Sequence, residues 1–215
     1  MDFFFCVQDT DLYEGMDPAD LAKLPDTTNS QVYQQGEVLF SPDQPAQDVF
    51  ILKEGEVDLY LEEDGKKITI ETIVPGEVFG DFSNYKTVYT AKVARKTFIC
   101  KTPKKVFMHA LAQNNQLCFR FMQLLADRLT YYENRLASLV RPAKQQVVDE
   151  LLRMKAKEER TIFGKVFRFP VKISHQRLAE RVGLNRVTVT RILGDLKKEG
   201  RVKVNDKTGE IQVKV

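Results

Sequence analysis

The sequence predicts an α+β protein in three successive parts: a β-rich N-terminal region, a long central helix, and a C-terminal region of two short helices followed by a β-hairpin. Three observations predict this order. Short apolar runs separated by turn residues fill the first half, apolar residues then recur at helical spacing, and a capped helix-glycine-helix pattern follows. The expected bounds of the three parts are residues 1–103, 104–140 and 141–215.

Short runs in the N-terminal region have the apolar or alternating composition of β-strands. Glycine-bearing turns separate them, among them Gly36, Gly55 and Pro75-Gly76, and the Glu-Asp-Gly-Lys sequence at 63–66 is a good hairpin signal. Many short strands with such turns predict a sandwich or a barrel. The runs lie at residues 38–40, 49–52, 57–61, 68–70, 78–79 and 98–99.

A metalloenzyme of the cupin type would share this β architecture, but its metal would need several histidine ligands. The chain has only two histidines, His109 and His175, and both lie outside the predicted strands. The sequence therefore predicts neither an enzyme nor a metal or cofactor site.

The central region, from about residue 102 to residue 140, changes to a helical pattern without proline or glycine after residue 103. Apolar residues recur there at alternating steps of four and three, which is the spacing of a coiled-coil seam and predicts a two-fold dimer. Phe121, Leu124 and Ala126 lie beside this seam and are expected to pack on the β-rich region; an ordinary core helix is the alternative. The seam consists of Cys118, Met122, Leu125, Leu129, Tyr132, Leu136 and Leu139.

Near the C-terminus, Ser174 is a candidate N-cap for a first short helix, and Gly183 can supply the positive φ of a tight turn. Asn185 is a candidate cap for a second helix, whose core side has i, i+3, i+4, i+7 spacing. The opposite side is expected to carry Arg186, Val187, Thr190 and Arg191, at the positions from which a recognition helix reaches base edges in DNA.

After the second helix, Gly200 and two alternating runs at 202–204 and 211–213 predict a strand, a turn and a strand. This completes the pattern of a winged helix, although a packed helical hairpin is the simpler alternative. Charge favours the DNA-binding reading. Residues 141–215 hold 19 Lys plus Arg against 9 Asp plus Glu, a net of +10, whereas residues 1–103 hold 9 against 19, a net of −10.

The cysteines Cys6, Cys100 and Cys118 are odd in number and widely spaced. They argue against a disulfide framework, a zinc site or a four-cysteine iron-sulfur cluster, so we expect buried or half-buried thiols. The chain starts without the basic segment of a signal peptide and has no apolar run long enough to span a membrane. We expect a cytoplasmic protein without a membrane partner.

The order of an acidic β-rich region, a long helix and a basic helix-turn-helix resembles the CRP/FNR family of bacterial transcription regulators over nearly the whole chain. GEVLFSPDQPAQDVFILKEGEVDLY and PGEVFGD are similar to the family's cyclic-nucleotide-binding-type β-roll, and SHQRLAERVGLNRVTVTRIL is similar to its DNA-binding motif. The helix over 118–139 is similar to its dimerisation helix. The resemblance implies a β-roll of jelly-roll type, a homodimer, and double-stranded DNA and RNA polymerase as partners.

The resemblance places Arg186 and Arg191 at base-contacting positions, where arginine can pair with O6 and N7 of guanine. Val187 stands where many members have an acidic residue, so the recognised sequence is expected to differ from theirs. Residues expected to contact DNA phosphates are Ser174, His175, Gln176, Lys197, Lys203 and Lys207.

The corresponding effector pocket departs from the cyclic-nucleotide binders of the family. They have an arginine for the phosphate, whereas here a shortened loop leads to Tyr89-Thr90, and Arg95 on the next strand is the candidate substitute. Tyr132 and Glu133 stand where hydroxyl partners of the base are usual. We therefore expect no cyclic AMP in the usual pose. The candidate pocket residues are Gly80, Asp81, Tyr89, Thr90, Tyr132 and Glu133.

These features predict a sequence-specific regulator that binds an inverted repeat as a homodimer. Two alternatives stay open: a ligand-binding signalling module whose DNA affinity is incidental, and a general DNA-binding protein with little sequence preference. Arg186, Thr190 and Arg191 favour the first interpretation, because they have no evident scaffold purpose.

Overall fold

The computed structural model describes residues 6–21, 29–82, 87–162, 165–168, 171–205 and 210–213. The chain forms two compact units, of which the first holds residues 1–64 and 70–131 and the second holds residues 65–69 and 132–215. The division therefore falls within the long helix α4 (Asn115–Leu139). No helix in the described part of the chain is long and apolar enough to cross a membrane.

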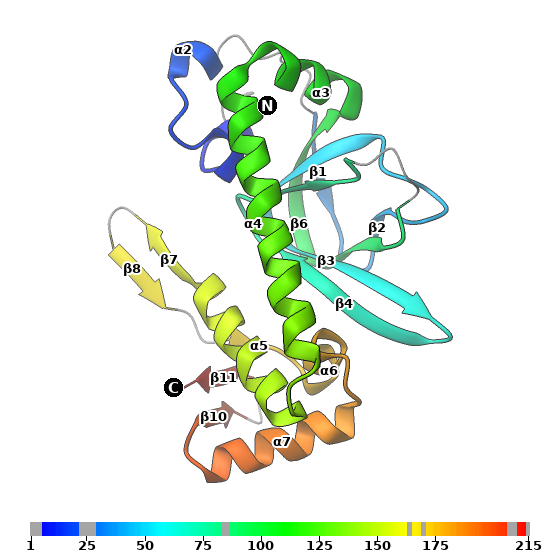
Figure 1. Ribbon diagram of the computed structural model, residues 1–215, viewed down its shortest axis with the longest axis vertical. Helices are drawn as coiled ribbons and strands as arrows, with labels where there is room; N and C mark the ends of the chain where they lie inside the picture. The colour runs from blue at the N-terminus through cyan, green and yellow to red at the C-terminus, as the bar shows by residue number, and fades with distance from the viewer. Residues whose placement is uncertain are drawn as a thin grey trace. The chain divides into compact units, whose positions relative to one another are not determined.

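A six-stranded antiparallel sheet, all of which except residues 66–69 belongs to the first unit, is the framework of that unit (Figure 1). Its longest strands, β3 (Asp48–Glu63) and β6 (Thr90–Pro103), pair along most of their length. β6 also pairs with β1 and β2, while β3 also pairs with β4 and β5. The bounds of these four strands are Asn29–Tyr33, Val38–Phe40, Lys66–Ile73 and Val78–Gly80.

The predicted strands are confirmed except in the middle of β3. The runs at 49–52 and 57–61 were expected to be two strands separated at Gly55, and this is wrong: both lie in β3, which continues through the glycine. Gly55 has a φ of 89°, and the register with β6 shifts around it. A Cβ at Gly55 would lie 2.2 Å from the carbonyl oxygen of Lys96, so glycine here permits a close approach of two strands rather than a turn.

Two apolar clusters fill the first unit. One is built mainly from strand residues, in which the rings of Phe40, Phe50 and Phe79 follow one another with centroids 5.8 and 5.2 Å apart. The other joins the sheet to the helices, where the ring of Phe107 meets that of Phe121 edge to face at 5.3 Å. The helices are thus fixed to the sheet by burial of their apolar sides.

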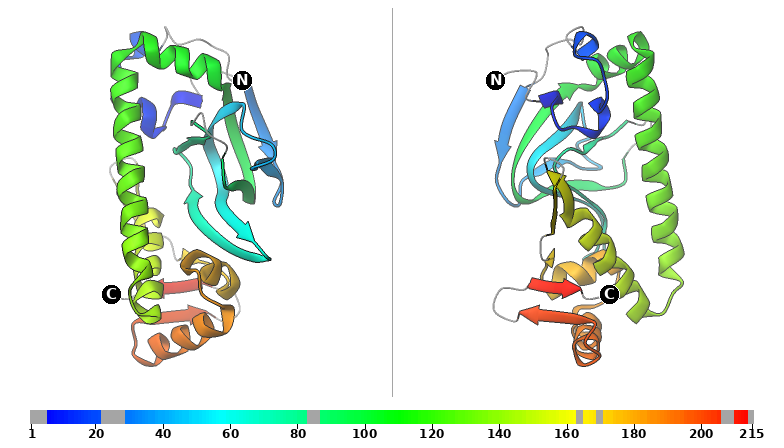
Figure 2. Two further views of the ribbon diagram at one scale, coloured as in Figure 1. Left: turned by 45° about the vertical axis from the view of Figure 1, so that its right-hand side comes forward. Right: turned by 90° about the vertical axis from the view of Figure 1, so that its left-hand side faces the viewer.

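The predicted helical region is confirmed as two helices, α3 (Lys104–Gln113) and α4, which meet at Asn114 (Figure 2). The Asn114 side chain accepts a hydrogen bond from the backbone N–H of Leu117 at 2.9 Å and so caps α4. Phe121 and Leu124 pack on the first unit as expected. Ala126 was expected to pack there too, but it is exposed, because it lies on another side of the helix.

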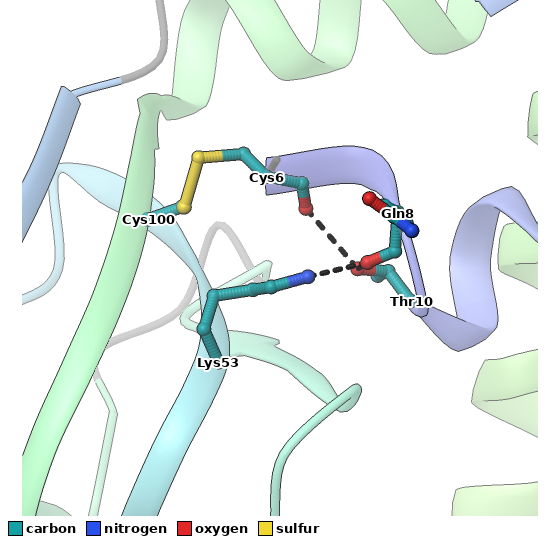
Figure 3. Close-up of a disulfide and its surroundings, with 5 residues drawn as sticks. All are labelled: Cys6, Gln8, Thr10, Lys53 and Cys100. Atoms are coloured by element: carbon teal, nitrogen blue, oxygen red, sulfur yellow. Dashed lines mark hydrogen bonds between the residues drawn. A yellow bond between two sulfur atoms is a disulfide. The ribbon is translucent and has the colours of Figure 1, made fainter. Parts of the chain in front are cut away.

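The N-terminal segment contains a 3₁₀ turn, η1 (Asp11–Tyr13), and the short helix α2 (Pro18–Leu21). A disulfide joins Cys6 in this segment to Cys100 in β6 (Figure 3). Free thiols were expected at both positions, and this is wrong: the fold brings their Cα atoms to 5.9 Å although 94 positions separate them in sequence. Cys118 remains a free, half-buried thiol.

The second unit packs three helices against a small sheet. α5 (Ala143–Glu158), α6 (His175–Val182) and α7 (Arg186–Lys198) share one core with Val202 and Ile211. The predicted strand-turn-strand is confirmed as β10 (Val202–Asn205) and β11 (Glu210–Val213), and β11 also pairs with β9 (Val171–Lys172). A hairpin of β7 (Glu159–Ile162) and β8 (Lys165–Arg168) was not predicted.

Candidate nucleic-acid interface

Helix α6 begins and ends at the residues that its sequence predicts. Its N-cap is Ser174, whose hydroxyl oxygen accepts a hydrogen bond from the backbone N–H of Arg177 at 3.2 Å. Its last turn ends at Gly183, which has a φ of 70° and so turns the chain sharply. Leu178, Ala179 and Val182 are buried in the core of the second unit.

Helix α7 begins after the three residues 183–185, and Asn185 is its N-cap. The Asn185 side-chain oxygen accepts from the backbone N–H of Thr188 at 2.8 Å. One side of the helix is buried at every predicted core position, namely Val189, Ile192, Leu193 and Leu196. Only one side of α7 therefore packs on the core, and its other side faces solvent.

That other side carries the four residues predicted to face DNA, and Arg186, Val187, Thr190 and Arg191 are all exposed. The apolar side chain of Val187 is 79% exposed. The hydroxyl of Thr190 lies 3.0 Å from Nδ1 of His175, so a side chain of α6 contacts the exposed face of α7.

The predicted phosphate-contacting residues belong to the start of α6, the end of α7 and β10, apart from Lys207. Ser174 and Gln176 are exposed beside the start of α6, and the Gln176 amide donates to Glu180 at 3.0 Å. Lys197 is exposed at the end of α7, and Lys203 is exposed on β10. Lys207 lies outside the described residues.

The predicted effector pocket was placed around the end of β5. Here the hydroxyl of Tyr89 donates to the carbonyl oxygen of Gly80 at 3.2 Å. Burial raises the pKa of the Tyr89 phenol above its ordinary value, so the hydroxyl stays protonated and remains a donor. Asp81 is buried and Thr90 is half-buried. Tyr89 is thus held at the end of β5 by a hydrogen bond to Gly80.

Sequence reasoning missed Arg128, which belongs to this region. Its Nε lies 3.2 Å from a carboxylate oxygen of the buried Glu71, and its Nη2 donates to the carbonyl oxygen of Val78 at 3.1 Å. Arg128, Asp81 and Glu71 are all close enough to Tyr89 to influence its pKa. The pairing has no local sequence signal, because Arg128 comes from α4 and Glu71 from β4.

The other residues proposed for the pocket are either exposed or belong to the second unit. Arg95, the candidate substitute cation, is 65% exposed and pairs with Glu56 at 3.1 Å, so its guanidinium faces solvent. Tyr132 and Glu133 belong to the second unit, where Tyr132 is half-buried and Glu133 is exposed.

The predicted dimer seam is an exposed apolar row on α4. Most of its aliphatic members are at least half exposed, and Leu129 and Leu136 are 59% and 65% exposed. Cys118 and Tyr132 are half-buried. Contiguous exposed apolar residues of this kind are typical of protein interfaces. The exposed members are Met122, Leu125, Leu129, Leu136 and Leu139.

Two family models match the chain in the order of its two units. Residues 30–114 match the cyclic nucleotide-binding domain, and residues 145–214 match the Crp-like helix-turn-helix domain. The chain belongs to the CRP/FNR family of transcription regulators. As in other CRP/FNR regulators, its helix-turn-helix domain is a DNA-binding domain, and the CRP/FNR relatives that it matches are transcription regulators.

The chain aligns with individual CRP/FNR relatives over most of their length. The global nitrogen regulator of Synechococcus elongatus is 28% identical over 190 residues, which cover 81% of this chain and 82% of that protein. The CRP-like cAMP-activated global transcriptional regulator of Mycobacterium tuberculosis is 21% identical over 202 residues, covering 92% and 90%. The structure of FixK2 from Bradyrhizobium japonicum superposes with a TM-score of 0.74 at 22% identity, covering 88% and 93%, and shows that the fold is shared.

Proposed function

We propose that this protein is a homodimeric transcription regulator that recognises an inverted repeat in double-stranded DNA and does not require cyclic AMP. The exposed face of α7 carries the proposal: Arg186, Val187, Thr190 and Arg191 point away from a fully buried opposite side. The guanidinium group of arginine can donate two hydrogen bonds to O6 and N7 of guanine, and an apolar side chain can contact the methyl group of thymine.

Contacts to the DNA backbone come from residues around that face. Ser174, His175, Gln176, Lys197, Lys203 and Lys207 would bind phosphates and set the orientation of α7 in the major groove. The DNA-binding domain is residues 141–215, after a sensor-type domain at 1–103 and a dimerisation helix region at 104–140. Such a regulator acts in the cytoplasm and contacts RNA polymerase.

Dimerisation is supported by the exposed apolar row on α4. A second copy of the chain would cover Leu129, Leu136 and their neighbours, and two-fold symmetry would then present two α7 helices to DNA. The half-site centres should lie about one helical turn, roughly 34 Å, apart.

Independence from cyclic AMP is supported by the chemistry around Tyr89. A buried phosphodiester needs a cation that is free to pair with it, but Arg128 already pairs with Glu71. The buried carboxyl group of Asp81, which is close enough to influence the pKa of Tyr89, would disfavour a further negative charge there.

In-vitro selection of bound DNA on the purified protein tests the proposal. We expect an inverted repeat with G·C pairs at the positions read by the two arginines. A general DNA-binding protein would return no consensus, and a signalling module would return little bound DNA.

Light scattering on Leu129→Lys, with the exposed Thr130→Lys as control, tests the dimer. A Leu129→Lys variant that stayed dimeric would place the interface elsewhere.

Single substitutions separate base reading from phosphate binding. Arg186→Ala or Arg191→Ala should weaken the preferred site by about 1–3 kcal/mol and relax one base pair in each half-site. Lys203→Ala should weaken all sequences alike and reduce the salt dependence. Equal losses on specific and random DNA for the arginine variants would mean that they touch only phosphates.

Calorimetry with cyclic AMP and cyclic GMP tests the remaining element of the proposal. We expect no binding at micromolar nucleotide and no change in DNA affinity. Tight nucleotide binding with a rise of about tenfold or more in DNA affinity would contradict it.

A further inference from the structure

A buried carboxylate in the second unit gathers three arginines. Glu150 of α5 is 2% exposed. One of its oxygens lies 3.0 Å from Nε of Arg181, and the other lies 3.5 Å from Arg153 and 3.8 Å from Arg135. The guanidinium groups of Arg135 and Arg181 are themselves almost fully enclosed, so these pairs are shielded from water.

The three arginines come from different helices. Arg153 shares α5 with Glu150, Arg181 belongs to the last turn of α6, and Arg135 belongs to the C-terminal part of α4. Glu150 therefore connects the end of α4 to the first helix of the helix-turn-helix, with all participants inside one compact unit.

Arg135 also connects α4 to α6 by a hydrogen bond to the backbone. Its Nη2 donates to the backbone carbonyl of Arg181 and to that of Thr69, in the 65–69 segment of the same unit. The carbonyls of a final helical turn have no partner inside the helix and attract cations. The hydroxyl of Ser138 in turn donates to the Arg135 carbonyl at 2.7 Å. Arg135 thus contacts the end of α6 directly through the Arg181 carbonyl and indirectly through Glu150, which pairs with both arginines.

Stability alone does not account for such a cluster, since replacing buried ion pairs with apolar side chains is often neutral or stabilising. Ion pairs and hydrogen bonds differ from apolar packing in being directional. Four charged side chains from three helices therefore specify the angle at which those helices meet.

We propose that Glu150 and Arg135 are positioning residues that fix the orientation of α6, and through Gly183 that of α7, relative to the end of α4. This proposal rests on the proposed function, because in a dimer on an inverted repeat that orientation sets the half-site spacing that the protein accepts. Neither residue touches DNA: both are buried, whereas the base-reading face of α7 is exposed.

The test measures DNA affinity against half-site spacing. The selected inverted repeat is shortened or lengthened by one and two base pairs, and the wild-type protein is compared with Glu150→Gln and Arg135→Lys. Glu150→Gln keeps the shape and removes the charge; Arg135→Lys keeps the charge and removes the planar fork. Asp149→Asn is the matched control, because Asp149 is the neighbouring residue of α5 and pairs with Arg141 and Gln145 outside the cluster.

We expect the wild-type protein and Asp149→Asn to lose affinity steeply when the spacing changes. For Glu150→Gln and Arg135→Lys, the loss per base pair should be smaller by about two- to thirtyfold, because the helices accept other angles. A uniform loss at every spacing would overturn the proposal and leave the cluster with a structural role only. If Glu150→Gln does not fold by circular dichroism, Arg135→Lys decides.

A distance measurement separates failure of this proposal from failure of the proposed function. Spin labels on cysteines introduced at the exposed positions Asn134 of α4 and Lys198 of α7, in a Cys118→Ser background diluted with unlabelled protein, report the orientation of α7 without DNA. The distance distribution should broaden in both variants but not in Asp149→Asn. A wild-type protein without spacing preference contradicts the proposed function, whereas an unchanged distribution in the variants contradicts the positioning role itself.

Discussion

The sheet of the first unit joins distant parts of the chain, whereas the helix-turn-helix of the second unit is defined by contacts between near neighbours. In the sheet, Asn29 pairs with Lys101, and Cys6 is bonded to Cys100. In the helix-turn-helix, the side chains of Ser174 and Asn185 each cap the backbone three residues further on.

This difference predicts where each unit is vulnerable. Closing a long loop costs conformational entropy before its contacts can form, so the first unit depends on links that hold distant segments together. The second unit depends on caps and turns, each of which contributes little. A substitution that destabilises one unit should therefore leave the other folded. The loss in the free energy of unfolding should be larger where the affected contact closes a longer loop.

The largest effect is expected from the disulfide. Replacing Cys6 and Cys100 together with alanine opens a loop of 94 positions, for which chain entropy predicts a loss of about 4–5 kcal/mol in the free energy of unfolding. In scanning calorimetry, the transition of the first unit should move to lower temperature and that of the second should not. Cys118→Ala, which removes a free thiol, should move neither; a shift of both transitions by the double variant would mean that the units unfold together.

A smaller loss is expected at Gly55. Gly55→Ala combines an unfavourable positive φ with a Cβ that would lie 2.2 Å from the Lys96 carbonyl oxygen, and should destabilise the first unit by about 3 kcal/mol. Gly36→Ala is the matched control: its φ is 95°, but no atom lies within 4 Å of the new Cβ, and a loss of about 1 kcal/mol is expected. Denaturant titration compares them, and equal losses would show that the strand contact relaxes freely.

The smallest effect is expected at a cap of the second unit. Asn185→Ala removes the acceptor for the Thr188 N–H and should destabilise the second unit by about 1 kcal/mol, whereas Asn185→Gly should cost only about a few tenths. The first unit's transition should stay in place in both variants. If alanine and glycine destabilised the second unit alike, the capping hydrogen bond would not be what holds the start of α7.

The predictability of the fold follows the same division. The helices α6 and α7 were predicted with their caps, because serine, glycine and asparagine signal helix ends locally. Strand β1 was missed, because its NSQVY sequence is mostly polar and has no apolar alternation. The sequence predicts a turn at Gly55, since glycine within an apolar pattern does not reveal whether the chain turns or another strand approaches. The Cys6–Cys100 bridge has no signal at all in the sequence spacing.

For the candidate site, periodicity was enough to place Arg186, Thr190 and Arg191 on one exposed face. It was not enough for the ion pairs. Arg128 and Glu71 lie on separate elements, and Glu150 has the sequence context of a solvent-facing helix residue. Charged residues are almost never fully buried unless they are paired, so only the tertiary contacts reveal that these carboxylates are enclosed.

The bridge between Cys6 and Cys100 also makes the first part of the chain topologically a ring. Cutting one peptide bond anywhere between these two residues would leave a single covalent molecule, since the sulfur atoms still join the two pieces. Such a nicked protein would run as one band on a denaturing gel and separate into two only after reduction. If cleavage alone releases a fragment, the bridge is open in that preparation. If reduction is also needed, the bridge is closed, and no spectroscopy is required to tell the two apart.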